Sequence, residues 1–156
     1  MSGLFANPAP ERTQVWSCGG GTQSAAIAAL IVQGRLPKPD LAVIVDTERE
    51  KSETWRYYDA VLRPVLAQAG VNLVRVLKSN HTKVDLFSGK GGTLLPVFTD
   101  QSGSHSKLPA YCSGEWKRDV AMRWMRAQGV EQAVNWLGIS LDEMRTTCWP
   151  GSFGGS

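Results

Sequence analysis

The sequence has few of the features that mark secreted, membrane-spanning or metal-dependent proteins. It contains only three cysteines, at positions 18, 112 and 148, and no two of them have CxxC spacing. This scarcity argues against a disulfide framework, and against an iron–sulfur or structural zinc site, which usually needs four ligands. The two histidines, His81 and His105, have no metal-ligand spacing, and we expect both to face solvent.

Long hydrophobic runs are absent as well. No stretch approaches the roughly 18 consecutive apolar residues of a membrane span. Residues 1–12 lack the apolar run after a basic start that a signal peptide shows. Together with the few cysteines, these absences lead us to expect a protein of the reducing cytoplasm that has no membrane partner.

The chain also lacks an excess of charge of one sign. Its net charge is only +3 and it has no long basic run, so nucleic-acid binding is not indicated, whereas small anionic ligands are compatible. A hydrophobic content of 42% and a charged content of 20% are ordinary for one globular domain. We expect that domain to span residues 13–145, between a flexible arm at residues 1–12 and an unstructured tail at residues 146–156.

Short apolar segments alternate with amphipathic segments along the chain. Residues 41–45, Leu-Ala-Val-Ile-Val, form a continuous apolar run, which is typical of a strand buried on both faces of a parallel sheet. The alternation predicts strands at residues 13–17, 41–45, 71–77 and 133–137, and helices at residues 22–33, 51–69 and 113–128. The expected fold class is therefore α/β, with a three-layer, doubly wound, mostly parallel sheet and helices on both faces.

Local signals set the expected ends of the helices. Thr22 is a candidate N-cap for the first helix, and Thr47 to Glu50 fits a capping box before the second. Pro64 should kink the second helix or end it early. Residues 78–111 are the least regular part, and we expect them to form a functional or mobile loop, with one helical turn at residues 85–88.

The richest stretch in chemical terms runs from Val15 to Ile27, where an apolar segment stops at three glycines before a helix. Glycines let backbone N–H groups approach a ligand closely, and a helix N-terminus adds unpaired donors and partial positive charge. Side-chain hydroxyls lie nearby at three positions, namely Ser17, Thr22 and Ser24. The stretch predicts a phosphate cradle, with a plain glycine-rich turn that binds nothing as the alternative.

Other predicted strand ends should lie beside this loop. In open α/β sheets ligands bind at the carboxyl ends of strands, where the strand order reverses. That rule gathers three segments, Gly19–Ser24, Asp46–Thr47 and Gly138–Ser140. The loop does not match the Walker pattern GxxxxGK[ST], but its sequence GxGxxS nearly matches the dinucleotide fingerprint, with Asp46 as the ribose-binding acid. A Rossmann-type dinucleotide binder therefore stays as a minor alternative.

The segment Gly19-Gly20-Gly21-Thr22-Gln23-Ser24 is similar to the SGGxD[ST] loop of PP-loop ATP pyrophosphatases. Four further pieces follow in order: Val45-Asp46-Thr47-Glu48 with Glu53-Thr54-Trp55, Leu95-Pro96-Val97-Phe98, Cys112-Ser113 with Lys117, and Trp136-Leu137-Gly138-Ile139 with Asp142, Glu143 and Arg145. Together they resemble the phosphoadenosine phosphosulfate reductase branch of that superfamily, the adenine nucleotide alpha-hydrolases, over residues 13–145.

The resemblance implies a protein that binds ATP or phosphoadenosine phosphosulfate as its substrate, with Mg²⁺ possible and no iron–sulfur cluster. It implies nucleotide-binding roles for Ser17, Gly19, Gly20, Gly21, Thr22, Gln23, Ser24, Val45, Asp46, Thr47 and Gly138. It implies catalytic roles for Cys112, Lys117 and Arg145, by thiolate attack on a nucleotide-held sulfate or by nucleotidyl transfer.

Two departures from the family pattern shape this expectation. Gln23 stands where ATP-cleaving members carry Asp, and a neutral amide contributes no charge to Mg²⁺ binding. The redox cysteine of the reductases lies in an ECG-type segment that has no counterpart here. The alternative is a nucleotide-binding module or accessory subunit without turnover, and a homo-oligomer fits either reading.

Several single residues have plainer alternatives. Asp46 could cap a helix, Lys117 could be a solvated helix lysine, and Cys112 could be a half-buried turn residue. We expect Cys18 to be buried, because it ends a strand. We expect Trp116 and Trp124 to belong to the core, with no metal-binding residues in the chain.

Overall fold

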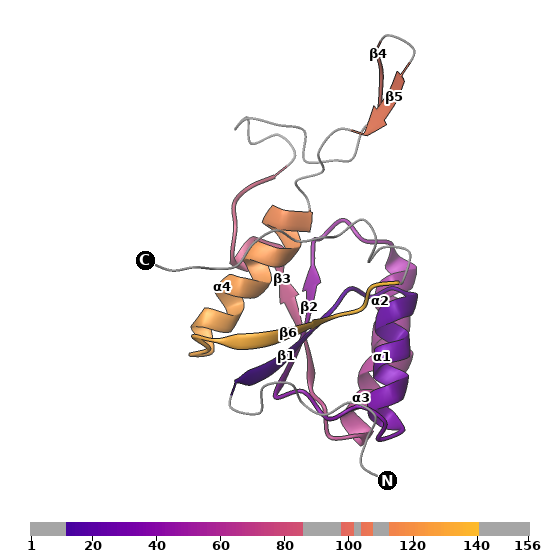
Figure 1. Cartoon of the computed structure of the whole chain (residues 1–156), viewed down its shortest axis with the longest axis vertical. Coiled ribbons are helices and arrows are strands. Elements are labelled where there is room, and N and C mark those ends of the chain that lie inside the picture. The colour runs from indigo at the N-terminus through magenta and orange to yellow at the C-terminus, as the bar shows by residue number, and fades with distance from the viewer. Residues whose placement is uncertain (1–11, 86–97, 102–103, 108–112, 141–156) are drawn as a thin grey trace.

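In the part of the chain that the structure describes, the main sheet has four parallel strands (Figure 1). The computed structural model describes residues 12–85, 98–101, 104–107 and 113–140. In the order β3-β2-β1-β6, the strands are Leu73–Leu77, Leu41–Asp46, Thr13–Cys18 and Ala133–Leu137. The chain moves outward from β1 through β2 to β3 and then returns to the other side of β1. The strand order therefore reverses between β1 and β6, and the predicted α/β class with a parallel sheet is confirmed.

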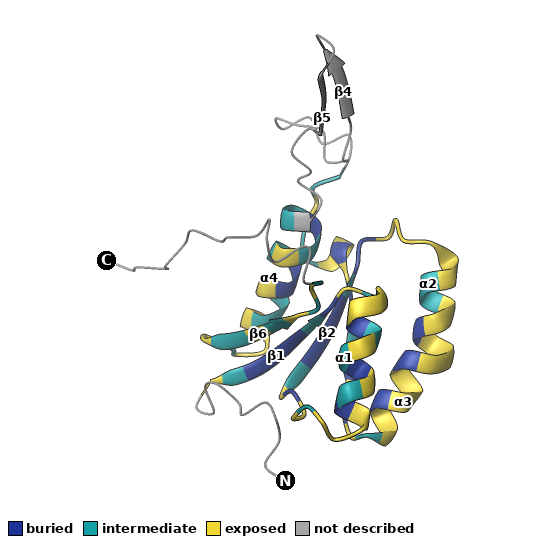
Figure 2. Ribbon diagram, turned by 45° about the vertical axis from the view of Figure 1, so that its right-hand side comes forward, coloured by how far each residue is buried: buried dark blue, intermediate teal, exposed yellow. Residues whose placement is uncertain are grey.

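Helices cover both faces of this sheet because both faces of its inner strands are apolar. On one face, Trp16, Ile44 and Leu73 belong to a core with residues of α1 (Thr22–Val32), α3 (Arg63–Gln68) and the segment between α2 (Ser52–Tyr57) and α3. On the other face, Val15 and Val43 pack against α4 (Asp119–Ala127). Figure 2 shows β1 and β2 buried between these helices.

The predicted helix 51–69 is divided into α2, a π-helical segment η1 (Tyr58–Leu62) and α3. Pro64 lies in the first turn of α3, directly after the π-helical turns. Proline has no N–H to donate, and its ring crowds the preceding turn of the helix. The wider π-helical turns lie directly before the point where the helix lacks the hydrogen bond of that N–H. The expected disturbance at Pro64 is thus confirmed as a change of helical pitch.

Both predicted N-caps are wrong. Gly21, not Thr22, is the N-cap of α1, and Lys51 is the N-cap of α2 with no side-chain hydrogen bond. Thr47 is buried directly after β2, and residues 48–51 separate it from the start of α2. The capping box at Thr47 to Glu50 therefore does not form.

The predicted helix 113–128 consists of a π-helical turn η3 (Ser113–Arg118) followed by α4, and a short 3₁₀ turn η2 (Lys78–Asn80) follows β3. An antiparallel hairpin of β4 (Phe98–Gln101) and β5 (Ser104–Lys107) was not predicted. Its residues are mostly polar and give no strand periodicity. No helix among the described residues is long and apolar enough to cross a membrane.

Some predictions lie outside the described residues. These are the arm up to residue 11, the tail at residues 146–156, and the helical turn after Asp85. Asp85 itself is described, and it is not helical.

Candidate functional site

The glycine loop joins β1 to α1 at the carboxyl end of the sheet. Gly20 has φ +75°, a left-handed conformation that glycine adopts without strain. A Cβ on Gly20 would lie 3.4 Å from Ile44 Cδ1 and 3.5 Å from Thr54 Cγ2. The backbone N–H of Gly19 donates to Ser24 Oγ at 2.8 Å, and Ser24 is buried. The Ser24 hydroxyl therefore supports the loop from inside the protein.

The start of α1 is open to solvent. Gly21, Thr22 and Gln23 are exposed, and among the described residues no side chain caps the helix. The first turn contains no acidic residue, so nothing there competes with an anion for the partial positive charge of the 11-residue helix. This end of α1 keeps backbone donors for a ligand.

The end of β6 lies directly against the start of α1. A Cβ on Gly138 would approach the carbonyl carbon and Cβ of Gln23 to 3.0 Å, and the backbone nitrogen of Ser24 to 3.1 Å. Three residues before Gly138, Asn135 Oδ1 on β6 accepts a hydrogen bond from Ser17 Oγ on β1 at 2.8 Å. The sequence-based expectation that Gly19–Ser24 and Gly138 meet at the switch point is confirmed.

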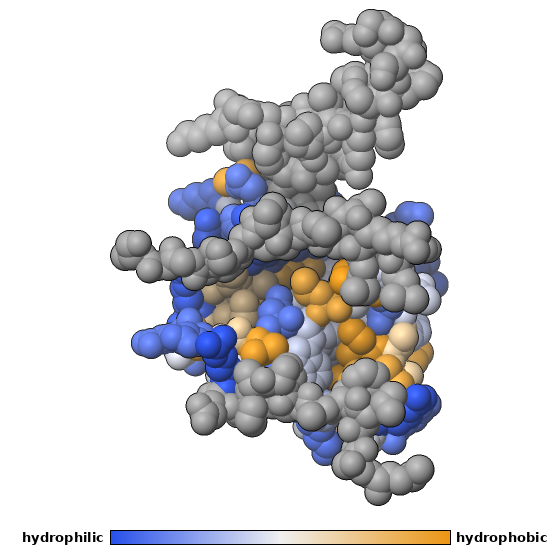
Figure 3. Space-filling model, in the orientation of Figure 1, coloured by the Kyte–Doolittle hydropathy of each residue, from blue (hydrophilic) through white to orange (hydrophobic). Residues whose placement is uncertain are grey.

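The end of β6 exposes two large apolar side chains. Leu137 and Ile139, at the end of β6, are 60% and 49% exposed. Figure 3 shows apolar surface among hydrophilic side chains on the side of the molecule that Figure 1 presents.

The end of β2 is fixed by Asp46, whose side chain is only 4% exposed. Its Oδ1 accepts the backbone N–H of Glu48 at 2.7 Å, and its Oδ2 accepts Arg75 Nε at 3.0 Å and a second guanidinium N–H. Both carboxylate oxygens thus already have protein partners, and the aspartate stabilises the turn at Glu48, which has φ +61°. Asp46 is therefore not the cap of α2.

Sequence reasoning missed Arg75. It lies in the middle of β3, in the sequence Leu-Val-Arg-Val-Leu, and its guanidinium lies 3.7 Å from the centroid of the Trp55 ring. A lone charged residue inside an apolar strand was the available signal, because such a charge needs a partner. Val45 is half-buried and Thr47 buried, so side chains close to the end of β2 are mostly enclosed.

The candidate catalytic residues are only partly described. Lys117, on the π-helical turn η3, forms an ion pair with Glu50 Oε1 at 3.0 Å and is half-exposed. Cys112 and Arg145 lie outside the described residues, as does the segment Leu95–Val97. Lys117 is thus engaged by a carboxylate from the loop after β2.

Cys18 is buried beneath the glycine loop, as predicted. Burial raises the pKa of the Cys18 thiol, an effect partly offset by hydrogen bonds with the Gly20 backbone and the Ser24 side chain. The thiol is therefore protonated at neutral pH and is a poor nucleophile.

The tryptophans and histidines follow their predictions in part. Trp116 is buried and Trp124 packs against the core, both as expected. His81 is half-buried rather than solvent-facing, and its carbonyl accepts a hydrogen bond from Arg123. The side chain of His105 is outside the description.

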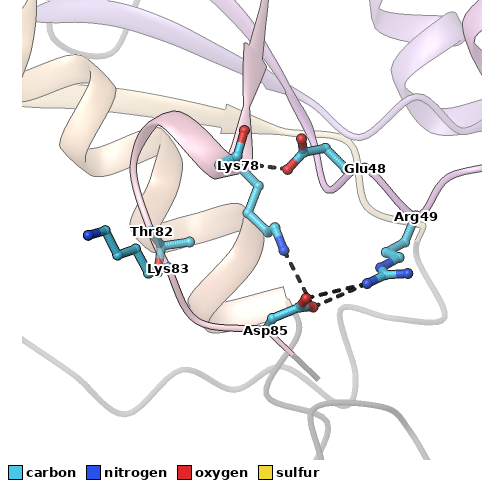
Figure 4. A pocket seen from close by; sticks show the side chains of 7 residues that line it. Glu48, Arg49, Lys78, Thr82, Lys83 and Asp85 are labelled. Atoms are coloured by element: carbon cyan, nitrogen blue, oxygen red, sulfur yellow. Dashed lines mark hydrogen bonds and ion pairs between the residues drawn. The ribbon is translucent and has the colours of Figure 1, made fainter. Parts of the chain in front are cut away.

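A cavity of about 400 Å³ lies next to the ends of β2 and β3 and was not predicted (Figure 4). Its lining residues are Glu48, Arg49, Lys78, Ser79, Thr82, Lys83 and Asp85. Lys78 and Arg49 both point at the carboxylate of Asp85. The sequence offered little signal here, because these residues come from two separate loops.

Within the described ranges, no group of three or more His, Cys, Asp or Glu side chains is placed to hold a metal ion. No protein-family model, curated protein or solved structure matches the chain. The geometry of its own residues must therefore carry the functional argument.

Proposed function

We propose that this protein binds an adenine nucleotide at the glycine loop, in the manner of the phosphoadenosine phosphosulfate reductase branch of the PP-loop superfamily. The proposed fold is the three-layer adenine nucleotide alpha-hydrolase-like one. The observation that supports this most strongly is the contact of Gly138 with Gln23 and Ser24. It puts the uncapped start of α1 at the point where the strand order reverses, which is where open α/β sheets bind ligands.

In this proposal the phosphate or sulfate groups accept hydrogen bonds from backbone N–H groups of residues 21–23. The adenosine part lies toward the end of β2, at residues 45–47, next to the Thr54 side chain that borders Gly20. Lys117 and Arg145 neutralise negative charge, and Mg²⁺ would accompany ATP. For Lys117 this requires the ion pair with Glu50 to open.

The proposed chemistry is sulfonucleotide reduction. The Cys112 thiolate would form a bond to the sulfate sulfur while the S–O bond to the nucleotide breaks, and the nucleotide phosphate leaves with the electron pair. A dithiol then supplies the electrons that release sulfite and regenerate the thiol. With ATP, the corresponding reaction is nucleotidyl transfer, in which a nucleophile of an acceptor molecule would form a bond to the α-phosphorus while the P–O bond to pyrophosphate breaks.

Binding without turnover is the second candidate. Gln23 is exposed at the start of α1, in the position where ATP-cleaving relatives carry an acid, and it adds no charge for Mg²⁺. Lys117 is already paired with Glu50. Both observations favour a module that holds a nucleotide without cleaving it.

The test of binding is calorimetry with ATP and with phosphoadenosine phosphosulfate. Gly20→Val should abolish binding, because a branched side chain at φ +75° strains the loop and crowds Ile44 and Thr54. Gly34→Val is the matched control, because Gly34 has φ +69° at the other end of α1 with nothing within 4 Å. Unchanged affinity in Gly20→Val, or an equal loss in Gly34→Val, would contradict the assignment.

The test of turnover uses the same nucleotides with a dithiol, and it measures sulfite and pyrophosphate. Cys112→Ser should keep binding and lose sulfite release if the thiol is the nucleophile. Glu50→Gln should raise nucleotide affinity, because it frees Lys117. Binding with neither product would favour the module over the enzyme.

A further inference from the structure

The cavity at the ends of β2 and β3 brings two cationic side chains to one carboxylate. Among the described residues that line it, Arg49, Lys78 and Lys83 are cationic and Glu48 and Asp85 are acidic, and the ammonium of Lys83 points away from Asp85 (Figure 4). Glu48 lines the same cavity, where its Oε2 accepts the backbone N–H of Ser79 at 3.1 Å. Asp85 is thus the carboxylate on which Lys78 and Arg49 converge, and its position marks the point where an anion would meet both cations.

Lys78 is the most unusual member of the cavity. Its side chain is only 8% exposed, and its ammonium lies 4.4 Å from the centroid of the Trp116 ring. The distance from Lys78 Nζ to Asp85 Oδ1 is 3.7 Å, which is an ion pair but too long for a hydrogen bond. An ammonium has three donors, so this buried charge is only loosely compensated by Asp85.

Arg49 holds the same carboxylate through two long hydrogen bonds. Its guanidinium Nη2 lies 3.3 Å from Asp85 Oδ1 and 3.4 Å from Oδ2. Charge-assisted hydrogen bonds of this kind are normally about 2.7–2.9 Å long. Two cations therefore converge on one carboxylate at long range, and Ser79 and Thr82 line the same space.

The walls of this cavity are held in place by the rest of the fold. Trp116 Nε1 donates to the carbonyl of Val84 at 2.9 Å, and Arg123 donates to the carbonyl of His81 at 2.7 Å. The segment that carries Lys78 and Asp85 is thus fixed at two points by η3 and α4. The Lys78–Asp85 side of the cavity is therefore held by packed elements, whereas Arg49 reaches Asp85 from the exposed loop after β2.

We propose that this cavity is a second anion-binding site, which takes a phosphate- or sulfate-sized oxyanion on Lys78 and Arg49 in place of the Asp85 carboxylate. The oxyanion comes either as a free ion or as the phosphoryl group of a small molecule. The tetrahedral anion offers more acceptor oxygens than a carboxylate, so it satisfies donors of Lys78 and Arg49 that Asp85 leaves at long range. This site is independent of the glycine loop and does not depend on the proposed nucleotide binding.

The experiment is a titration of the full-length ¹⁵N-labelled protein with inorganic phosphate and with sulfate, followed by NMR at constant ionic strength. The amide signals of Ser79 and Thr82 should shift and saturate, whereas chloride at the same ionic strength should leave them in place. A response to chloride equal to that of phosphate would overturn the proposal.

Variants at the cavity should change phosphate affinity in opposite directions, and the distant variant Arg35→Met distinguishes this from a general charge effect. Lys78→Met keeps an unbranched chain on Trp116 and removes the charge, and it should weaken phosphate binding roughly tenfold or more. Arg49→Gln, at an exposed side chain, should weaken it in the same direction without risk to the fold. Asp85→Asn removes the internal competitor and should tighten binding by about three- to tenfold. Unchanged affinity in Asp85→Asn would refute the displacement.

Two controls separate the sources of the anion. Arg35→Met removes an exposed cation that follows α1, and it should leave phosphate affinity unchanged. Titration of Gly20→Val with AMP and with adenosine then tests for a phosphoryl group at this cavity. Shifts at Ser79 with AMP but not with adenosine assign a phosphoryl-bearing ligand, and shifts with phosphate alone assign the free ion.

Discussion

Replacing Gly138 by alanine tests the contact that brings β6 and α1 together. The added Cβ would lie 3.0 Å from two atoms of Gln23 and 3.1 Å from the backbone nitrogen of Ser24. Carbon atoms in contact are normally about 3.5–4.0 Å apart, so the overlap is about half an ångström. Two of the three neighbours are backbone atoms, which cannot rotate away, so the strand and the helix must separate.

The expected cost follows from that overlap. Overpacking of this kind destabilises a protein by about 1–3 kcal/mol. Separation of β6 from α1 also displaces the backbone donors of the glycine loop, so the nucleotide should bind more weakly. A loss of about 1.4 kcal/mol of binding free energy weakens the nucleotide affinity tenfold. Urea denaturation measures the free energy of unfolding, and calorimetry measures the affinity.

Two alanine variants serve as controls. In Gly19→Ala the new Cβ meets only Ser24 Oγ, at 3.6 Å, so the stability should change by less than about 0.5 kcal/mol. Gly129, just before β6, has φ +80°, and a Cβ there would meet nothing within 4 Å. Gly129→Ala should therefore cost about 1–2 kcal/mol of backbone strain and leave the nucleotide affinity unchanged. Wild-type stability in Gly138→Ala would show that β6 does not contact α1, and the main support for the proposed function would fall.

Three further predictions concern the pairing of the buried Asp46 with Arg75 and the buried side chains of Tyr58 and Cys18. Arg75→Met should lower the free energy of unfolding by about 1–3 kcal/mol, because the buried Asp46 then keeps the Glu48 N–H but loses its guanidinium partner. Adding Asp46→Asn to the same chain should restore part of that stability, and denaturation that shows the two losses simply adding would contradict the pairing. Tyr58→Phe removes the 2.7 Å hydrogen bond to the Leu73 carbonyl and should cost about 1–3 kcal/mol. Burial raises the pKa of Tyr58 above its usual 10.0, so the stability that the neutral phenol provides is present below pH 10 and lost as pH rises through the raised value. Tyr58→Phe should therefore lose less stability than the wild type above pH 10, and an equal loss in both proteins would refute the raised pKa. Cys18, whose pKa burial raises above 9.0, should resist alkylation at pH 8 in the folded protein and react after denaturation, as mass spectrometry of its peptide would report; rapid labelling of the native chain would show that the loop exposes it.

Much of the architecture was determined by sequence pattern alone. The apolar run from Leu41 to Val45 identified an inner strand, because only a strand covered on both faces tolerates continuous apolar residues. The glycines that precede α1, and the strand-end rule for parallel sheets, were enough to predict that Gly138 meets the glycine loop. Strand and helix positions were therefore mostly correct, with ends off by a residue or two.

What the tertiary structure decided were partnerships between residues far apart in the chain. The pairing of Asp46 with Arg75, 29 positions away, depends on the register of β2 against β3, which local periodicity does not encode. The engagement of Lys117 by Glu50 and the cavity around Lys78 depend on how two loops pack after separate strands. Sequence by itself placed the glycine loop at the reversal of the sheet, because composition and periodicity determine elements. Only the packed fold decided which charges face one another, because such distances depend on all the elements at once.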